Sequence, residues 1–236
     1  MNMANLYRQL CGVPPNMCYD AAYAKNAQEA ADACKKNGDI YHNLGHYTNE
    51  CNLHMGTPDT TPADSVKEYI ADSIKSIDDQ RGHRAWILYP RSTRTGFGMS
   101  GKFHAMRTCD LSGNAIGTPR SYPGRGFFPK EYLLGEYWSY YAVRANSIGS
   151  EATVRMWRLP RSPKSAPSAA ALAAAQEIKL KRVVPHPDIG GYPVDNTIDW
   201  MPDDTQMPTR DGKPVGVYWV SISSGRFHDE YVVELY

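Results

Sequence analysis

The chain has 236 residues, a hydrophobic fraction of 42% and a formal net charge of +1, so it can bury one large core or two smaller ones. The near-neutral charge argues against a broad nucleic-acid-binding surface, because phosphate binding normally needs a basic face. The sequence contains no apolar run long enough for a transmembrane segment and no visible signal peptide.

The cysteines all lie in the first half of the chain and none forms a CxxC pair: Cys11, Cys18, Cys34, Cys51 and Cys109. This spacing is poor for a structural zinc site. One or two disulfides with a leftover thiol are expected if the protein is exported, and free cysteines in the cytosol are the alternative.

Two helices are predicted in the first 75 residues. The first covers 20–37, with Asp20 as N-cap, alanines at three- and four-residue spacing, and Gly38 at its end. The second begins near Thr61, where a threonine cap precedes a proline and an acid, and continues into an apolar stripe. The connection between them, 39–60, is polar and rich in histidine and is predicted to be a loop.

The segments Thr93–Met99 and Phe103–Cys109 are predicted to form a hairpin around Ser100-Gly101-Lys102. The first 110 residues therefore indicate an α+β arrangement, with helices packed on a small antiparallel sheet.

The second half of the chain is predicted to be a β sandwich, because alternating segments are separated by clusters of Gly, Pro and Asp. The predicted strands are 137–144, 152–159, 177–184, 197–200, 215–223 and 230–236. Its tryptophans are expected in the core rather than on a ligand platform. The Pro/Ser/Ala-rich segment 160–176 is predicted to be a mobile loop with a helical turn at its alanines. The domain boundary is expected at 120–136, where turn residues are dense.

Histidines concentrate between the two predicted helices. His42, His46, Glu50 and His54 recur every four residues and would share one face of an unbroken helix, which could bind a metal. Gly45 weakens that helix, so scattered loop histidines are the favoured interpretation. His83, at the start of a short apolar turn, is either hydrogen-bonded in the core or directed into a cleft, and residue types alone favour the core.

The stretch GHRAWILYP at 82–90, followed by TGFG at 95–98, resembles the signature of the CAP superfamily. This family comprises cysteine-rich secretory proteins, antigen 5 and pathogenesis-related proteins, and the match is most similar to its bacterial branch. Further elements that resemble those of the family occur in the expected order. They are His42 after an alanine-rich helix, the segment Asn49–Leu53, and the helix carrying Tyr69 and Asp72. The resemblance covers about residues 5–110.

The resemblance implies an α-β-α sandwich over 1–125 whose cavity is lined by His42 and His83, with Asp72 as the acid on the helix. Cys51 falls where the family has its other acid, and Glu50 lies one place earlier. Cys51 would then be a soft metal ligand, a reactive thiol or half of a disulfide, with Cys109 as the favoured partner. Cys11 and Cys18 could close a second disulfide. The β-rich part, 136–236, resembles the extension of some bacterial members and is expected to be an immunoglobulin-like sandwich.

The function implied is that of a secreted, extracellular binding protein, whose export signal we expect to be missing from the printed sequence. The cavity would take a small molecule, a lipid or a divalent metal such as zinc, and the β domain would attach to a cell-surface component or another partner. The alternative is a metal-dependent, peptidase-like hydrolase in which His42 and His83 hold the metal and Asp72 or Glu50 is the catalytic base. A third possibility is a structural or adhesive protein.

Overall fold

The structure is a computed structural model that describes residues 1–73, 81–114, 118–143, 147–187 and 196–236. By its internal contacts the chain divides into two compact units. The first contains residues 1–9, 13–72 and 82–117, and the second contains 10–12, 73–81 and 118–236. The domain limits expected from the sequence, 1–125 and 136–236, stay predictions, as does the mobility of 160–176.

In its described residues the first unit combines four α-helices with two small sheets. Its helices are α1 (Asn2–Leu10), α2 (Ala21–Asn37), α3 (Pro62–Ala71) and α4 (Gly82–Ile87). Its strands are β1 (Cys18–Tyr19), β2 (Cys51–Met55), β3 (Arg94–Thr95), β4 (Phe97–Ser100) and β5 (Phe103–Arg107). Antiparallel pairing gives the sheet order β2-β5-β4, while β1 pairs in parallel with β3.

Helix α2 forms as the sequence predicts. The Asp20 side chain accepts a hydrogen bond from the Tyr23 amide, and Gly38 ends the helix in the left-handed conformation with φ of 83°. The buried face is nearly all alanine and packs on Leu53 and neighbouring residues of the sheet. Helix α2 and strand β4 are so close that a Cβ added at Gly98 would lie 2.2 Å from the backbone nitrogen of Gln28. Glycine on β4 is therefore what lets the helix lie directly on the strand.

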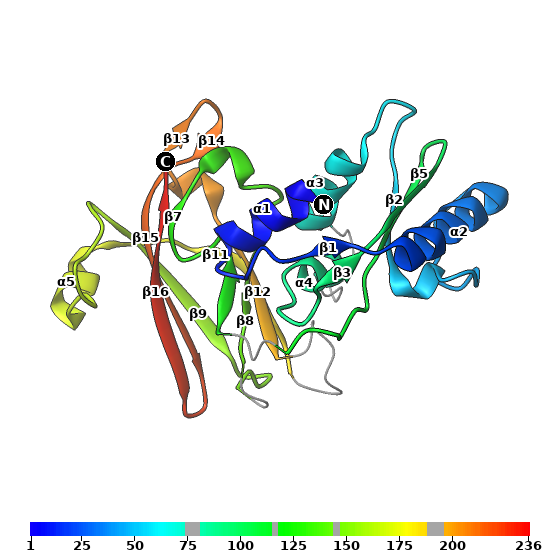
Figure 1. The fold of residues 1–236 in the computed structure, drawn as a ribbon. Helices are drawn as coiled ribbons and strands as arrows, with labels where there is room; N and C mark the ends of the chain where they lie inside the picture. The colour runs from blue at the N-terminus through cyan, green and yellow to red at the C-terminus, as the bar shows by residue number, and fades with distance from the viewer. Residues whose placement is uncertain (74–80, 115–117, 144–146, 188–195) are drawn as a thin grey trace. The chain divides into compact units, whose positions relative to one another are not determined.

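Helix α3 begins with the predicted cap, in which Thr61 and Asp64 bond each other's backbone amides in a capping box, and Pro62 follows the cap. It lies on the other side of the sheet, where Tyr69 donates a hydrogen bond to the carbonyl of His104 on β5. Helix α2, the sheet and α3 thus form three layers (Figure 1). This order agrees with the expected α-β-α arrangement.

Strand β2 lies inside the segment 39–60 that was predicted to be a loop, so that prediction was wrong for residues 51–55. The sequence of β2 does not show the usual pattern of one apolar and one polar face in an obvious way. The residues that face away from α2 are Asn52 and His54, which are polar although Asn52 is buried and His54 is half-buried. Cys51 and Leu53 face α2. The sheet therefore presents polar side chains to the layer that contains α3 and α4.

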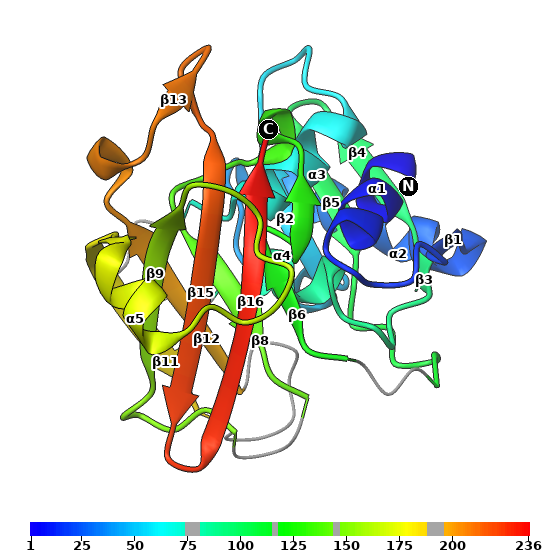
Figure 2. The same ribbon diagram turned by 90° about the vertical axis from the view of Figure 1, so that its left-hand side faces the viewer.

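The described residues of the second unit form two larger sheets. A five-stranded sheet has the order β10 (Gln176–Glu177), β9 (Thr153–Leu159), β15 (Gly216–Ser224), β16 (Phe227–Leu235) and β7 (Gly126–Phe128). A four-stranded sheet has the order β11 (Leu180–His186), β12 (Thr197–Pro202), β8 (Trp138–Tyr141) and β6 (Arg120–Tyr122). A separate short hairpin pairs β13 (Thr209–Arg210) with β14 (Lys213–Pro214). Figure 2 shows β9, β15 and β16 running side by side.

Aromatic rings join the two sheets. Trp138 on β8 meets Tyr218 on β15 edge to face at 6.0 Å between centroids, and Tyr140 stacks on Tyr231 at 6.2 Å. The prediction that the tryptophans belong to the core is confirmed, since Trp157, Trp200 and Trp219 are all buried. The predicted helical turn in 160–176 is α5 (Ala169–Ala174). The last residue of the predicted strand 137–144 lies outside the described residues.

Candidate functional site

Two histidines far apart in the sequence meet in the first unit. His42 lies in the loop after α2, and His83 lies in the first turn of α4. Their ring centroids are 6.4 Å apart and the ring planes are tilted by 34°. The structure therefore brings together the two residues that the sequence singled out most strongly.

The ring of His42 is fixed by its own loop. Its Nδ1 lies 2.8 Å from the carbonyl oxygen of Thr48, and because a carbonyl only accepts, Nδ1 carries the proton. The hydroxyl of the buried Thr48 lies 2.9 Å from the carbonyl of Gly45 and 3.1 Å from that of His42. These bonds close a short loop around one imidazole.

The ring of His83 is fixed by the end of the preceding helix. Its Nδ1 lies 2.9 Å from Oδ1 of Asp72, whose side chain is fully buried, so Nδ1 again carries the proton. Asn52 on β2 donates to the backbone carbonyl of His83 at 3.0 Å. Asp72 ends α3 in the left-handed conformation, with φ of 45°, and this geometry directs its carboxylate back toward α4.

Arg84, the residue after His83, joins the start of α4 to the end of α3. It is fully buried, and its guanidinium donates to the last carbonyls of α3, those of Ile70 at 2.6 Å and Ala71 at 2.9 Å. Its backbone amide donates to the second oxygen of Asp72 at 3.1 Å. The end of α3 and the start of α4 are thus locked together, and His83 is placed by both.

The same nitrogen is left available on each ring. With Nδ1 protonated and hydrogen-bonded, the neutral imidazoles of His42 and His83 each keep a lone pair on Nε2. This is the arrangement by which proteins orient histidine ligands, the second nitrogen donating to a carbonyl or carboxylate. Over the described ranges, with their gaps at 74–80, 115–117, 144–146 and 188–195, no group of three or more His, Cys, Asp or Glu could hold a metal ion. A metal here would have two imidazole ligands and complete its coordination with water or a ligand.

The other predicted site residues lie elsewhere. Glu50 forms an ion pair with Arg107, which also donates to the Glu50 carbonyl at 3.0 Å. Cys51 is buried in the core between α2 and the sheet, where burial raises the pKa of its thiol to about 12. His46 lines an open hollow of about 530 Å³ beside α2. The structure thus groups Asp72 with the two histidines, but not Glu50, Cys51 or His46.

None of the five cysteines, all of which lie in described segments, forms a disulfide, so neither expected pairing is present. Cys51 is buried against the alanines of α2, and Cys109 adopts a left-handed backbone conformation after β5. Cys18 is exposed and its thiol lies 3.2 Å from the carbonyl of Thr93, whereas Cys11 is buried. These local environments account for each thiol without a covalent partner.

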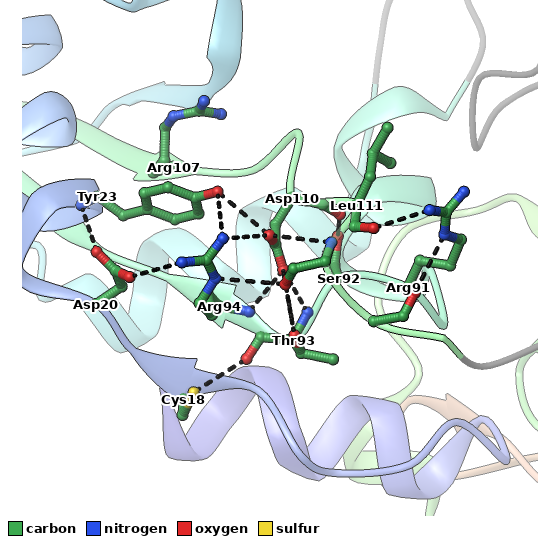
Figure 3. Close-up of polar contacts among 12 residues, drawn as sticks. Cys18, Asp20, Tyr23, Arg91, Ser92, Thr93, Arg94, Arg107, Asp110 and Leu111 are labelled. Carbon is green, nitrogen blue, oxygen red and sulfur yellow. Dashed lines mark hydrogen bonds and ion pairs between the residues drawn. The ribbon is translucent and has the colours of Figure 1, made fainter.

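A second polar cluster of this unit is centred on Asp110 (Figure 3). Its buried carboxylate accepts hydrogen bonds from the amides of Thr93 at 2.8 Å and Arg94 at 2.9 Å, and from the hydroxyls of Ser112 at 2.9 Å and Tyr23 at 3.2 Å. Burial alone would raise the pKa of Asp110, but these hydrogen bonds outweigh it and lower the pKa. Every oxygen of this carboxylate is engaged, so the cluster holds the chain together after β5.

Sequence reasoning missed the residues that hold the histidines. Asn52 and Tyr69 appeared only as parts of the family pattern and Thr48 appeared in none, and no contact with a histidine was predicted for them; the Tyr69 ring lies 5.6 Å from that of His83. The one available signal was the polar residue Asn52 inside a buried strand, because buried polar groups need partners. In the apolar turn that follows His83, Trp86 is half-buried, whereas Ile87 and Leu88 are fully buried.

With this geometry known, comparison with protein families is informative. Residues 1–110 match the family model described as the cysteine-rich secretory protein family, CAP. The first 110 residues are therefore similar to a CAP domain. No curated protein and no solved structure matches the chain. The match ends where the CAP domain ends, so it says nothing of residues 111–236.

Proposed function

We propose that the CAP domain is a binding module in which Nε2 of His42 and Nε2 of His83 hold a divalent metal, with Zn²⁺ the best fit. The observation that carries the proposal is that both rings lie 6.4 Å apart with both Nδ1 atoms already bonded to acceptors. Neutral imidazole is a preferred zinc ligand, and two imidazoles leave open positions. A small molecule with a carboxylate or phosphate group would complete the coordination shell.

Binding is favoured over hydrolysis because the two acids that could serve as catalytic base are already engaged in other contacts. One oxygen of Asp72 bonds His83 and the other bonds the Arg84 amide, so this carboxylate positions the ligand. Glu50 is paired with Arg107. A general base must reach the proton that it removes, and neither acid is free to do so without breaking these bonds.

We also propose that the protein is exported and that its β-rich unit attaches to a cell surface or partner. The match of residues 1–110 to the CAP family supports export, since CAP proteins are generally secreted. None of the described helices is long and apolar enough to cross a membrane. In the β-rich unit, Phe127 is 70% exposed and Tyr236 52% exposed, and their rings meet edge to face at 6.1 Å. An exposed aromatic pair suits a contact surface.

An immunoglobulin-like relationship of this unit also stays a proposal. Two facing sheets support it, but β7 and β16 pair in parallel, whereas that fold is built from antiparallel strands.

Calorimetric titration of the full chain with Zn²⁺ tests the metal site. The unaltered chain should release heat on binding, and His83→Ala should abolish that heat because one of the two ligands is lost. His46→Ala is the matched control, since this exposed histidine belongs to the same loop as His42 but lines a different hollow. Equal titration curves for the unaltered chain and His83→Ala would contradict the proposal.

A further inference from the structure

A second histidine pair lies on the sheet of the CAP domain, apart from His42 and His83. His54 on β2 and His104 on β5 are directly opposite in the antiparallel ladder, and Met99 on β4 is opposite His104 on its other side. Opposite residues of an antiparallel sheet project to the same face. Phe103 and Ala105 face α2, so the row His54–His104–Met99 faces the layer that contains α3.

The proton on the His104 ring can be placed from its neighbour. Nδ1 lies 2.9 Å from the Ser65 hydroxyl, and that hydroxyl lies 3.3 Å from the carbonyl of Thr61 one turn earlier in the chain. The hydroxyl has a single proton, and a helical serine commonly gives it to such a carbonyl. In the tautomer that uses this hydrogen bond, the ring donates from Nδ1 to the hydroxyl and keeps a lone pair on Nε2.

That Nε2 atom has no hydrogen-bond partner among the described residues, although His104 is only 3% exposed. Leaving a buried acceptor unpaired destabilises the fold, so it is a position where a ligand gains by binding. The ring of His54 lies 6.2 Å away between centroids, and its plane is turned by 76°. Burial lowers the pKa of His54 and of His104, so both rings are neutral near pH 7.

We propose that His104, His54 and Met99 form a binding site for monovalent copper. Imidazole nitrogen and thioether sulfur are soft, uncharged ligands, and thioethers select Cu⁺ over Zn²⁺. A single positive charge is also less costly to bury than a double one where no carboxylate belongs to the ligand set. The ion has a route in, because His54 is half-buried and Met99 is 49% exposed.

This site is separate from the zinc site proposed above and does not rest on it. The Tyr69 ring lies between the pairs, 5.6 Å from the His83 ring and 6.3 Å from the His54 ring. His42 is exposed, so water can complete the coordination of a divalent ion there. At the second pair His104 is only 3% exposed, which suits the low coordination numbers of Cu⁺.

The test is anaerobic titration of the full chain with Cu⁺, in competition with a chromophoric Cu⁺ chelator. Thiols bind Cu⁺ tightly, so Cys18→Ser/Cys109→Ser serves as the background; Cys11, Cys34 and Cys51 are at most 3% exposed. We expect one Cu⁺ per chain, and an affinity at least about tenfold lower for Met99→Leu and for His54→Ala. Met55→Leu is the matched control, an exposed methionine on the same sheet that pairs with Phe103.

Nitrogen-15 spectra of the imidazole rings show where the ion binds. Cu⁺ should shift the Nε2 signal of His104 and a ring nitrogen of His54, while His42 and His83 remain unchanged. His83→Gln should leave Cu⁺ affinity unaltered. The proposal is overturned if Met99→Leu and His54→Ala, folded by circular dichroism, keep the full affinity, or if Cu⁺ leaves the His104 signal in place.

Discussion

The two polar clusters of the CAP domain differ in what they leave unused. Around Asp110, both carboxylate oxygens are hydrogen-bonded to backbone amides and hydroxyls of the same unit. Around His42 and His83, equally short bonds fix one nitrogen of each ring but leave Nε2 as a free acceptor. A saturated cluster, in which every hydrogen-bonding atom has a partner within the chain, serves to stabilise the fold. A half-saturated cluster, in which Nε2 of each ring remains an acceptor, is suited to bind a ligand.

The largest effect is expected at Asp110. Asp110→Ala removes the acceptor of the Thr93 and Arg94 amides and should lower the free energy of unfolding by about 3 kcal/mol. Urea unfolding followed by circular dichroism measures this change. Zn²⁺ affinity of the molecules that remain folded should be unaltered. A large loss of Zn²⁺ affinity would mean that the two clusters are coupled.

The same carboxylate predicts how stability depends on pH. Its pKa is lowered in the folded protein, so its contribution is complete above the unfolded value of about 3.9 and is lost as the pH falls through the folded value. Asp110→Asn should flatten this part of the acid-unfolding curve. An unchanged curve would show that other carboxylates control acid unfolding.

A smaller effect is expected at Asp72, which belongs to the half-saturated cluster. Asp72→Asn can still accept the proton of His83 Nδ1 and suits the left-handed backbone, but it loses the negative charge behind the ring and the acceptor of the Arg84 amide. Zn²⁺ affinity should fall about 10–100-fold, the usual cost of altering such a partner of a metal-binding histidine. Calorimetry measures the affinity, and urea unfolding shows whether stability has changed as well. Unaltered Zn²⁺ affinity would show that this carboxylate does not tune His83.

The contrast also explains what the sequence could predict. Caps and spacing located α2 and α3, because Asp20, Gly38 and Thr61 act within one turn of chain. His83 was predicted from the resemblance of GHR to a family motif, and His42 from its position after the alanine-rich helix of the same family pattern. Strand β2 was missed because its buried residues include Asn52 and His54, whose partners come from α3 and α4. Partners that are distant in sequence leave no local pattern.

The position of Asp72 illustrates the same limit. The family pattern placed an acid on this helix, but only the left-handed end of α3 shows that its carboxylate lies behind His83. A backbone conformation of this kind is typical of glycine and is uncommon for other residues, so the sequence gives no warning of it. The role of an acid in a site therefore depends on a turn that residue types do not specify.

The smallest expected effect is at Thr48, whose hydroxyl closes the loop of His42 while its carbonyl holds the ring. Thr48→Val keeps the shape and the carbonyl but removes a buried hydroxyl, so stability should fall by about 1 kcal/mol. Zn²⁺ affinity should fall only severalfold, because His42 keeps its acceptor but in a looser loop. Thr48→Ser, which restores the hydroxyl, should recover the affinity. If Thr48→Ser binds Zn²⁺ as weakly as Thr48→Val, then side-chain volume and not the hydrogen bond positions His42, and the site is held by packing rather than by its polar partners.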